Sequence, residues 1–356
     1  MRARRILPAL ALVASAALLL SACALADTAA EEKRVAVIVS GVGSISPYTT
    51  PTEACESGLA AGATDTHIRQ YLRDQDIDVY TAPVMAGPVA VIPSASETEG
   101  GPYGECPSQL DADLTVDSTG SVFTAGENLA AFINHLHQEQ GVTQIDLVAH
   151  SLGGIYTRNA IKNLKDGDSP VTITSFTTIG SPWEPVMLAN PPYDPPAACD
   201  GLDVCEKVVT ALTEIESVRQ VVDFFQPESF NAWTADQAGV LDDIPVTLIA
   251  GSYFTKVNGR SDKWPNDGYI QYSAAIARSV GEDVLPMRVC FTEPFTHSPS
   301  TSAMVGAGPE TAITWTDQTG QIVDNAIKTA GTDKQLPNRL GCPDRLDAIS
   351  DEDAAP

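Results

Sequence analysis

The sequence predicts an α/β fold, in which helices alternate with the strands of a central sheet. The first observation is the run of β-branched and other apolar residues at 34–39, which is typical of a strand buried on both faces. The second is the alternation of helical and strand-like patterns that follows it along the chain. The third is residues 145–156, where an apolar run, a tight corner and a helical pattern follow one another.

Ser151 stands at that corner, between the apolar run 145–149 and the helical pattern that begins at Ile155. A serine on such a strand-to-helix turn adopts a strained backbone, so the residues two before and two after it must be small. Ala149 and Gly153 meet this requirement. The competing interpretation is a glycine-rich helix start in which Ser151 serves only as the N-cap. The rest of the chain must separate the two interpretations.

The segments before the corner are predicted in turn from their patterns. Residues 64–74 are predicted to be helical and residues 79–82 to form a strand. Residues 83–121 are rich in Pro, Gly, Ser and acidic residues, which predicts a long surface loop. A helix is predicted from Phe123 to Gly141, because apolar residues recur there at helical spacing, namely at Leu129, Phe132, Ile133 and Leu136.

After the corner, a helix is predicted to continue to about Lys165 and to end at Gly167-Asp168. Apolar runs then predict three strands, at 171–179, 246–250 and 286–291. A closing helix is indicated by the apolar residues Ile322, Val323, Ala326 and Ile327. Residues 185–243 interrupt the alternation with a proline-rich start and a helix whose apolar face holds Val208, Leu212, Ile215 and Val222, widened by Val218, Val221 and Phe225.

Four motifs together resemble those of the α/β-hydrolase lipases and esterases. The corner Ala149-His150-Ser151-Leu152-Gly153-Gly154 resembles the A-H-S-x-G-G form of small bacterial lipases, with Ala149 in place of the more usual glycine. The glycine-rich residues 40–44, directly after the first strand, resemble the oxyanion loop of this family. Residues 267–275 resemble the segment that bears the catalytic acid, and His297 follows the last strand. In addition, residues 178–182 resemble the turn that follows the post-elbow strand in many lipases.

The resemblance implies an α/β-hydrolase fold over residues 34–345, with a mostly parallel, doubly wound sheet. Residues 185–243 occupy the position of the cap that covers the nucleophile in this family. A helical layer packed permanently on the core would explain the same apolar face, so both interpretations stay open. The sequence thereby predicts a single catalytic domain that carries a helical cap insertion.

The resemblance also implies a catalytic triad and an oxyanion hole. Ser151 would be the nucleophile, His297 the general base and Asp267 the acid, with Asp262 as the second choice for the acid. This chain order of nucleophile, acid and base is that of the family, and His297 alone of the five histidines follows the acid. The backbone N–H groups of Val42 and Leu152 would stabilise the oxyanion, donors whose loss costs about 2.7–4 kcal/mol in comparable enzymes.

The function that the resemblance implies is hydrolysis of acyl esters, lipids among them, through an acyl-enzyme. An acyltransferase would use the same three residues and pass the acyl group to an alcohol or sugar instead of water. A surface protein that binds lipid without catalysis is a third possibility, since fold alone does not decide function. This chemistry requires no metal or organic cofactor, and the cysteine and histidine spacings do not match a zinc site.

The N-terminus has the pattern of a bacterial secretory signal. Arg2, Arg4 and Arg5 precede an apolar run at 6–20 that is too short to span a membrane comfortably. Leu20-Ser21-Ala22-Cys23 resembles a lipobox, which predicts removal of residues 1–22 and lipidation of Cys23. Residues 23–33 would then tether the domain to the outer face of the cytoplasmic membrane. Cleavage near Ala24 or Ala26 would instead release a secreted protein.

The other six cysteines form an even set, as expected of an exported chain. Six cysteines allow 15 pairings, and the sequence does not choose among them. The nearest-neighbour pairing is a hypothesis: Cys55 with Cys106, Cys199 with Cys205, and Cys290 with Cys342.

The composition bounds the remaining possibilities. The 356 residues, 43% of them hydrophobic, are enough to bury a large core. The net charge of −25 argues against nucleic acid as a partner, because phosphate would be repelled. Residues 346–356 form an acidic tail. The oligomeric state stays open, with a monomer as the default expectation.

Overall fold

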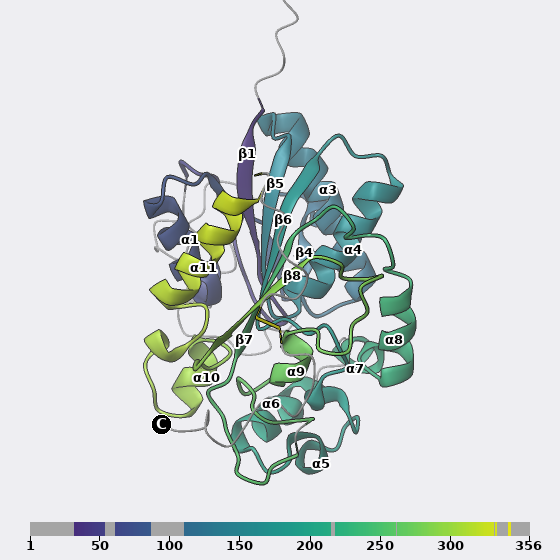
Figure 1. The fold of residues 1–356 in the computed structure, drawn as a ribbon, viewed down its shortest axis with the longest axis vertical. Coiled ribbons are helices and arrows are strands. Elements are labelled where there is room, and N and C mark those ends of the chain that lie inside the picture. The colour runs from purple at the N-terminus through teal and green to yellow at the C-terminus, as the bar shows by residue number, and fades with distance from the viewer. Residues whose placement is uncertain are drawn as a thin grey trace, which may run out of the picture. The chain divides into compact units, whose positions relative to one another are not determined.

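Six parallel strands form the central sheet of the computed structural model (Figure 1). The structure describes residues 32–53, 61–86, 110–214, 218–260, 262–330, 332 and 341–342. The strand order is β2-β1-β5-β6-β7-β8. The strands are β1 (Arg34–Val39), β2 (Val79–Thr81), β5 (Gln144–His150), β6 (Thr172–Ile179), β7 (Val246–Gly251) and β8 (Arg288–Glu293).

The sheet is doubly wound, as the sequence predicts, because the chain leaves β1 toward one edge and later continues toward the other. Central strands of such a sheet are covered on both faces, so their residues are apolar without alternation. In β1 the five residues from Val35 to Val39 are all buried. The predicted parallel α/β architecture is therefore confirmed.

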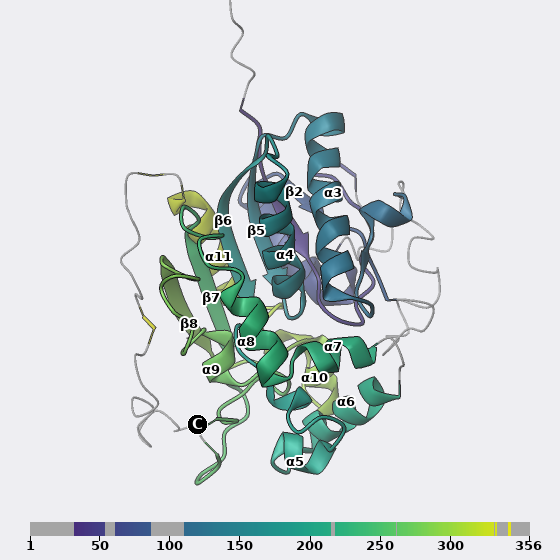
Figure 2. The same ribbon diagram turned by 90° about the vertical axis from the view of Figure 1, so that its right-hand side faces the viewer.

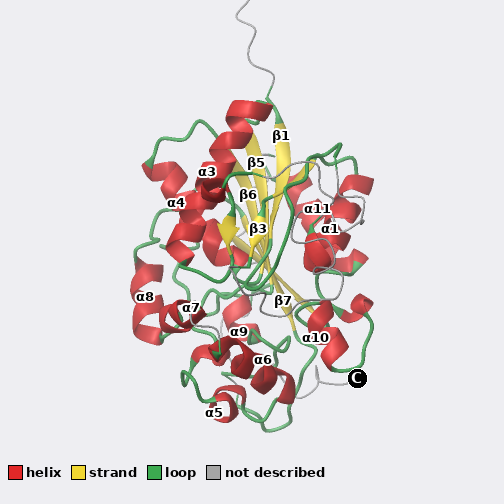
Figure 3. Cartoon of the chain, turned by 180° about the vertical axis from the view of Figure 1, so that it is seen from behind, coloured by secondary structure: helices red, strands yellow, loops and turns green. Residues whose placement is uncertain are grey.

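Helices cover both faces of the sheet (Figures 1 and 2). On one face lie α3 (Val122–Gln140) and α4 (Gly153–Asp166), which pack against each other. On the other face lie α1 (Gly62–Asp74) and α11 (Asp317–Thr329), which also form a pair. Figure 3 shows this second pair from behind, beside the strands.

The helix α3 shows why the periodic pattern predicts its segment well. Its N-cap Ser121 accepts a hydrogen bond from the Thr124 N–H, and Gly141 ends the helix in the left-handed conformation. The predicted apolar stripe is fully buried, with Leu129, Phe132, Ile133 and Leu136 each 0% exposed. Capping, periodicity and packing thus agree along the whole helix.

The prediction of a plain surface loop at 83–121 is wrong at both of its described ends. Residues Val84–Met85 form β3 and Val116–Asp117 form β4, and the two strands pair in parallel. A short 3₁₀ helix, η1 (Ala112–Leu114), precedes β4. Val84 and Val116 are fully buried, so this pair belongs to the core although the sequence around it is polar. Two-residue strands are too short to give a periodic signal.

The insertion at 185–243 is helical, but it is not the single long helix that its apolar face suggests. It contains η2 (Met187–Ala189), α5 (Pro195–Cys199), α6 (Asp203–Thr213), α7 (Val218–Phe224) and α8 (Pro227–Ala235). Apolar residues of both α6 and α7 line one common pocket. Figure 1 shows α5, α6 and α7 gathered beyond the carboxyl ends of the strands.

Two disulfide bonds follow the nearest-neighbour pairing. Cys199 bonds to Cys205 within the insertion, and Cys290 of β8 bonds to Cys342. Cys55 and Cys106 lie outside the described residues, so their pairing stays a prediction. The same holds for the signal sequence, the lipidation of Cys23, the tether up to residue 31 and the acidic tail.

Three short helices near the end of the chain complete the fold, namely α9 (Tyr272–Ala275), α10 (Pro299–Met304) and η3 (Pro309–Thr311). Among the described helices, none combines the length and the apolar character needed to cross a membrane.

Candidate active site

The turn between β5 and α4 places Ser151 at the carboxyl edge of the sheet. Ser151 has a φ of 55°, in the left-handed region that few residues other than glycine adopt. Its backbone N–H donates to the carbonyl of Ile179 at 2.9 Å, which fixes the turn against β6. Gly153 has to be glycine, because a Cβ there would collide with the Val39 carbonyl oxygen. The turn therefore has the strained geometry expected of a nucleophile elbow.

His297 joins Ser151 to Asp267 through two short hydrogen bonds. Its Nδ1 lies 2.7 Å from Asp267 Oδ2, and its Nε2 lies 2.8 Å from Ser151 Oγ. A carboxylate can only accept, so Nδ1 carries the proton and Nε2 accepts from the serine hydroxyl. All three side chains are buried, with Asp267 0% and His297 2% exposed. This is the arrangement that activates a serine nucleophile.

The loop after β7 holds the Asp267 carboxylate in place from its other side. Oδ1 accepts the backbone N–H groups of Tyr269 and Ile270, at 2.9 and 2.8 Å. The Asp267 carbonyl in turn accepts the His297 backbone N–H at 2.8 Å. Oδ2 is thereby left to face the imidazole.

Asp262, the second choice for the acid, does not approach His297. Its carboxylate pairs with Arg260 at 2.6 Å, and the two side chains are 58% and 63% exposed. The hydrogen bond from Arg260 lowers the pKa of Asp262. The geometry favours Asp267 as the acid, since the Asp262 carboxylate is turned to solvent while the Asp267 carboxylate faces His297.

The glycine loop after β1 lies directly against the elbow. A Cβ on Gly41 would stand 2.6 Å from the Ser151 Cβ and 3.0 Å from the Leu152 nitrogen. Only a glycine lets the loop come this close, which brings Val42 to the nucleophile. Among the described residues, no acceptor takes a hydrogen bond from the N–H of Val42 or Leu152. Both amides are therefore available to an oxyanion.

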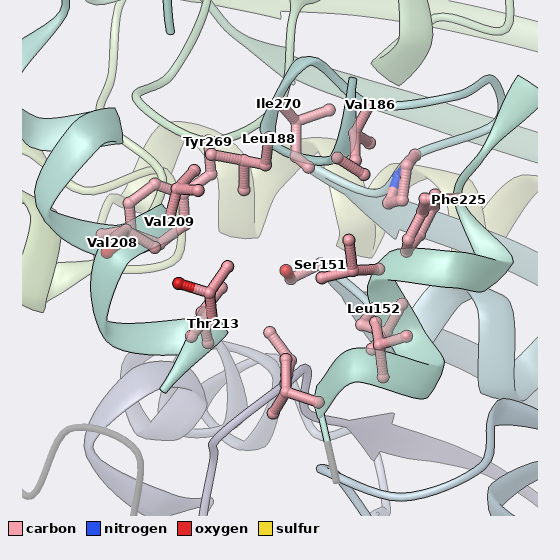
Figure 4. A pocket seen from close by; sticks show the side chains of 17 residues that line it. Ser151, Leu152, Val186, Leu188, Val208, Val209, Thr213, Phe225, Tyr269 and Ile270 are labelled. Carbon is pink, nitrogen blue, oxygen red and sulfur yellow. The ribbon is translucent and has the colours of Figure 1, made fainter. Parts of the chain in front are cut away.

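An apolar pocket opens at Ser151, between the elbow and the inserted helices (Figure 4). About 760 Å³ of space, including open solvent at the mouth of the pocket, is free of protein atoms. No charged side chain is found among the lining residues that the structure describes. Most are aliphatic, and many of these come from η2, α6 and α7, for example Leu188, Val208, Val209, Leu212, Val221 and Val222.

Three neighbours of the triad were not predicted to have roles in the site. Gly180, in the turn after β6, would place a Cβ 3.0 Å from Asp267 Oδ2 and 3.2 Å from His297 Nδ1. The Tyr269 ring lies 4.7 Å from the His297 ring, centroid to centroid. Asp65 of α1 is buried beside His150 of the elbow. The turn motif at 178–182 hinted at Gly180, but no local pattern marks Tyr269 or Asp65.

The buried carboxyl of Asp65 makes the stability depend on pH. Burial raises its pKa from 3.8 to about 7, although the hydrogen bond from Ser40 opposes the shift. The folded protein then binds a proton that the unfolded chain releases, so this stabilisation is complete below pH 4 and lost as pH rises through 7.

The wild type should therefore lose stability as the pH rises from about 4 to 7, and Asp65→Asn should not show this loss. The free energy of unfolding of Asp65→Asn minus that of the wild type should increase over this range by up to about 4 kcal/mol. Denaturant unfolding of both proteins across this range measures the difference. Burial also raises the pKa of Glu293 to about 7, but Glu293 is present in both proteins and cancels. A difference that stays constant with pH would contradict the shift at Asp65.

In the part of the chain that the structure describes, no group of three His, Cys, Asp or Glu side chains is placed to hold a metal ion. The remaining histidines lie away from the triad. His67 pairs with Asp317 at 3.0 Å, and His137 bonds the Val142 carbonyl at 2.8 Å.

One family model matches part of this chain. Residues 112–192, less than a quarter of the chain, match the model of a family described as "Putative serine esterase (DUF676)". The match contains β5, the elbow, α4 and β6.

Several solved structures resemble the chain at low identity. The lipase BlEst2 of Bacillus licheniformis in its propeptide form is 16% identical, with a TM-score of 0.45 over 74% of this chain and 46% of its own. The lin2722 gene product of Listeria innocua is 15% identical, with a TM-score of 0.45 over 87% and 99%. A lipase-esterase related protein of Clostridium acetobutylicum is 13% identical, with a TM-score of 0.41 over 83% and 96%.

Proposed function

We propose that this chain, which has the α/β-hydrolase fold, is a serine carboxylic-ester hydrolase that acts on esters with an apolar acyl group. The observation that carries the proposal is the hydrogen-bonded chain from Asp267 through His297 to Ser151, which lines the apolar pocket. A serine hydroxyl is a weak nucleophile, and a base within hydrogen-bond distance is what activates it. The serine esterase model that matches the elbow supports the same chemistry.

The reaction would proceed in two halves. His297 accepts the Ser151 proton as Oγ attacks the acyl carbonyl, and Asp267 stabilises the imidazolium that forms. The amides of Val42 and Leu152 would bind the oxyanion, and His297 would then give its proton to the leaving alcohol. A water molecule, activated by the same imidazole, would attack the acyl-enzyme and release the acid. An alcohol in place of that water would make the protein an acyltransferase.

The lining of the pocket supports an apolar acyl chain as the bound group. Each methylene that moves from water into such a pocket contributes about 0.8 kcal/mol. A charged acyl chain would lose its hydration without gaining an ion pair, because the described lining carries no charge. Acyl esters, lipids among them, are therefore the substrate class that we propose.

The test is hydrolysis of p-nitrophenyl esters of increasing acyl length by oxidised residues 24–356. We expect turnover that depends on Ser151 and a preference for apolar chains. A fluorophosphonate probe should label Ser151, and peptide mass spectrometry locates the label. Added alcohols should leave free acid as the main product, whereas mostly transferred ester would identify an acyltransferase. A folded protein with no turnover and no labelling would refute the proposal in favour of a binding protein.

The chain-length preference should change when the pocket is narrowed. Leu212 of α6 lines the pocket, so Leu212→Trp fills space that a long acyl chain would occupy. We expect kcat/KM to fall about 4- to 15-fold for long chains, because one or two methylenes lose their site at about 0.8 kcal/mol each, and to stay similar for acetate. The control is Val257→Trp, since Val257 is 83% exposed and outside the pocket. An equal loss for all chain lengths would contradict this use of the pocket.

We also propose that a lipid on Cys23 holds the enzyme at the outer face of the membrane. The support is the lipobox pattern Leu20-Ser21-Ala22-Cys23 alone. Full-length protein expressed in a bacterium should partition into detergent, whereas the Cys23→Ala variant should not gain the lipid. If both proteins instead stay in the aqueous phase to the same extent, the secreted form would be favoured.

A further inference from the structure

The histidine beside the nucleophile, His150, makes a contact with the candidate base that the reaction scheme does not use. His150 is 4% exposed, and its Nε2 lies 3.0 Å from the backbone carbonyl of His297. A carbonyl only accepts, so Nε2 of His150 carries the proton and donates. The two imidazole rings also pack, with centroids 4.7 Å apart.

The far side of His150 faces a buried polar network. Its Nδ1 lies 3.7 Å from Asp65 Oδ1, too far for a hydrogen bond but close enough for an electrostatic interaction. Ser40 donates to Asp65 Oδ2 at 2.5 Å, and the hydroxyls of Ser40 and Ser46 lie 2.8 Å apart. Ser40 is the first residue of the glycine loop that carries Val42. One polar network therefore extends from the loop that carries His297 to the glycine loop that carries Val42.

Two other rings pack against the His297 ring. Tyr269 packs on it at 4.7 Å, the same centroid distance as His150. Asp267 and Ser151 hold its two nitrogen atoms. His150 Nε2 contributes what these contacts do not, a donor that fixes the carbonyl of the residue bearing the imidazole.

We propose that His150 is a positioning residue that holds the base His297 through the hydrogen bond from its Nε2 to the His297 carbonyl. This inference rests on the proposed function, because it assigns a role within the same site. Positioning matters there because a displacement of 1 Å can cost about 100-fold in rate.

A neutral imidazole suits this position for an electrostatic reason. Burial holds the pKa of His150 well below its usual value, and the nearby His297 adds to this effect. A neutral donor fixes the carbonyl without opposing the imidazolium that His297 becomes during the reaction. Lysine or arginine could donate to the same carbonyl, but their charge would repel that cation. Among the residues that the structure describes, the charged and titratable groups that contact His297 are Asp267, Tyr269 and His150, with Asp65 behind His150.

Three substitutions separate the hydrogen bond from simple filling of space. His150→Gln keeps a donor at about the position of Nε2. His150→Phe keeps the ring and loses the donor. His150→Asn keeps polar atoms beside Asp65 but is too short to reach the His297 carbonyl, so it tests the loss of the donor without an apolar side chain beside the carboxyl.

For p-nitrophenyl ester hydrolysis we expect His150→Gln to keep kcat within about threefold of wild type. The Phe and Asn variants should lose about 10- to 100-fold in kcat with KM changed less than twofold, because the pocket is untouched. Thermal unfolding selects the variants that are folded under the assay conditions. Equal kcat in the Gln variant and in the folded Phe or Asn variant would overturn the proposal, because the donor would then be irrelevant.

A second readout does not depend on ester hydrolysis. The His297 Nδ1 proton in its short bond to Asp267 should give a downfield proton resonance, which Asp267→Asn removes. Its chemical shift should be the same in wild type and His150→Gln and should change in the Phe and Asn variants. If wild type hydrolyses no ester, the proposed function fails while this resonance still tests the positioning. An identical resonance in the wild type and in all three His150 variants would overturn the positioning role.

Discussion

Ser151→Ala is expected to lower kcat for ester hydrolysis by about 10⁶-fold, the largest effect among these predictions. Alanine lacks the hydroxyl that forms the acyl-enzyme, so only substrate binding and the amides of Val42 and Leu152 can still act. Those contributions leave a residual acceleration of about 10³- to 10⁴-fold over water in comparable enzymes. Stopped assays over long times, with purified acyl ester, measure this residual rate.

His297→Ala should cause a loss of similar size, and the double variant should lose little more. The reason is that the hydroxyl and the imidazole act as one unit, so removal of either already abolishes nucleophilic attack. Denaturant unfolding provides the control for folding of each variant. A Ser151→Ala protein with near-wild-type kcat would show that another group is the nucleophile.

The second large effect is expected at Asp267, where Asp267→Asn should lower kcat by about 10⁴-fold. The carboxylate accepts from Nδ1 of His297 at 2.7 Å and so keeps the lone pair on Nε2, facing Ser151. An asparagine amide can donate to Nδ1 instead, which places the imidazole proton on Nε2. His297 could then no longer accept the serine proton. The binding step should be little affected, so KM should stay near the wild-type value.

The matched control for this substitution is Asp262→Asn, which makes the same chemical change five residues away. Asp262 is exposed and pairs with Arg260, and salt bridges of this exposure contribute about 0–1 kcal/mol. We expect no measurable change in kcat from it. A larger loss at Asp262 than at Asp267 would mean that the acid is assigned to the wrong residue.

The sequence predicted the sheet and the larger helices because their patterns are local. The continuous apolar run of β1 and the buried stripe of α3 are each read within a single segment. The elbow is local as well, since small residues are required only two positions before and after Ser151. The chain order of Ser151, Asp267 and His297 then followed from the resemblance to α/β-hydrolases, not from spacing alone.

The short elements could not be predicted, because their stabilising contacts come from distant segments. Val84 pairs with Val116, more than thirty residues later, and each strand is only two residues long. The helices α6 and α7 share one apolar pattern in the sequence, yet they are separate elements whose apolar residues line the same pocket. Local periodicity records which residues are apolar but not where a helix stops to follow a curved surface.

By itself the sequence determined the α/β class, the nucleophile turn and the three residue types that could form a triad. The tertiary structure decided which aspartate faces His297, and it brought Asp65, His150 and Ser40 together behind the site. The physical reason is that a carboxylate acts through its direction and its distance. Asp262 and Asp267 are both acids of one loop, but two backbone N–H bonds turn Asp267 inward while Arg260 holds Asp262 at the surface.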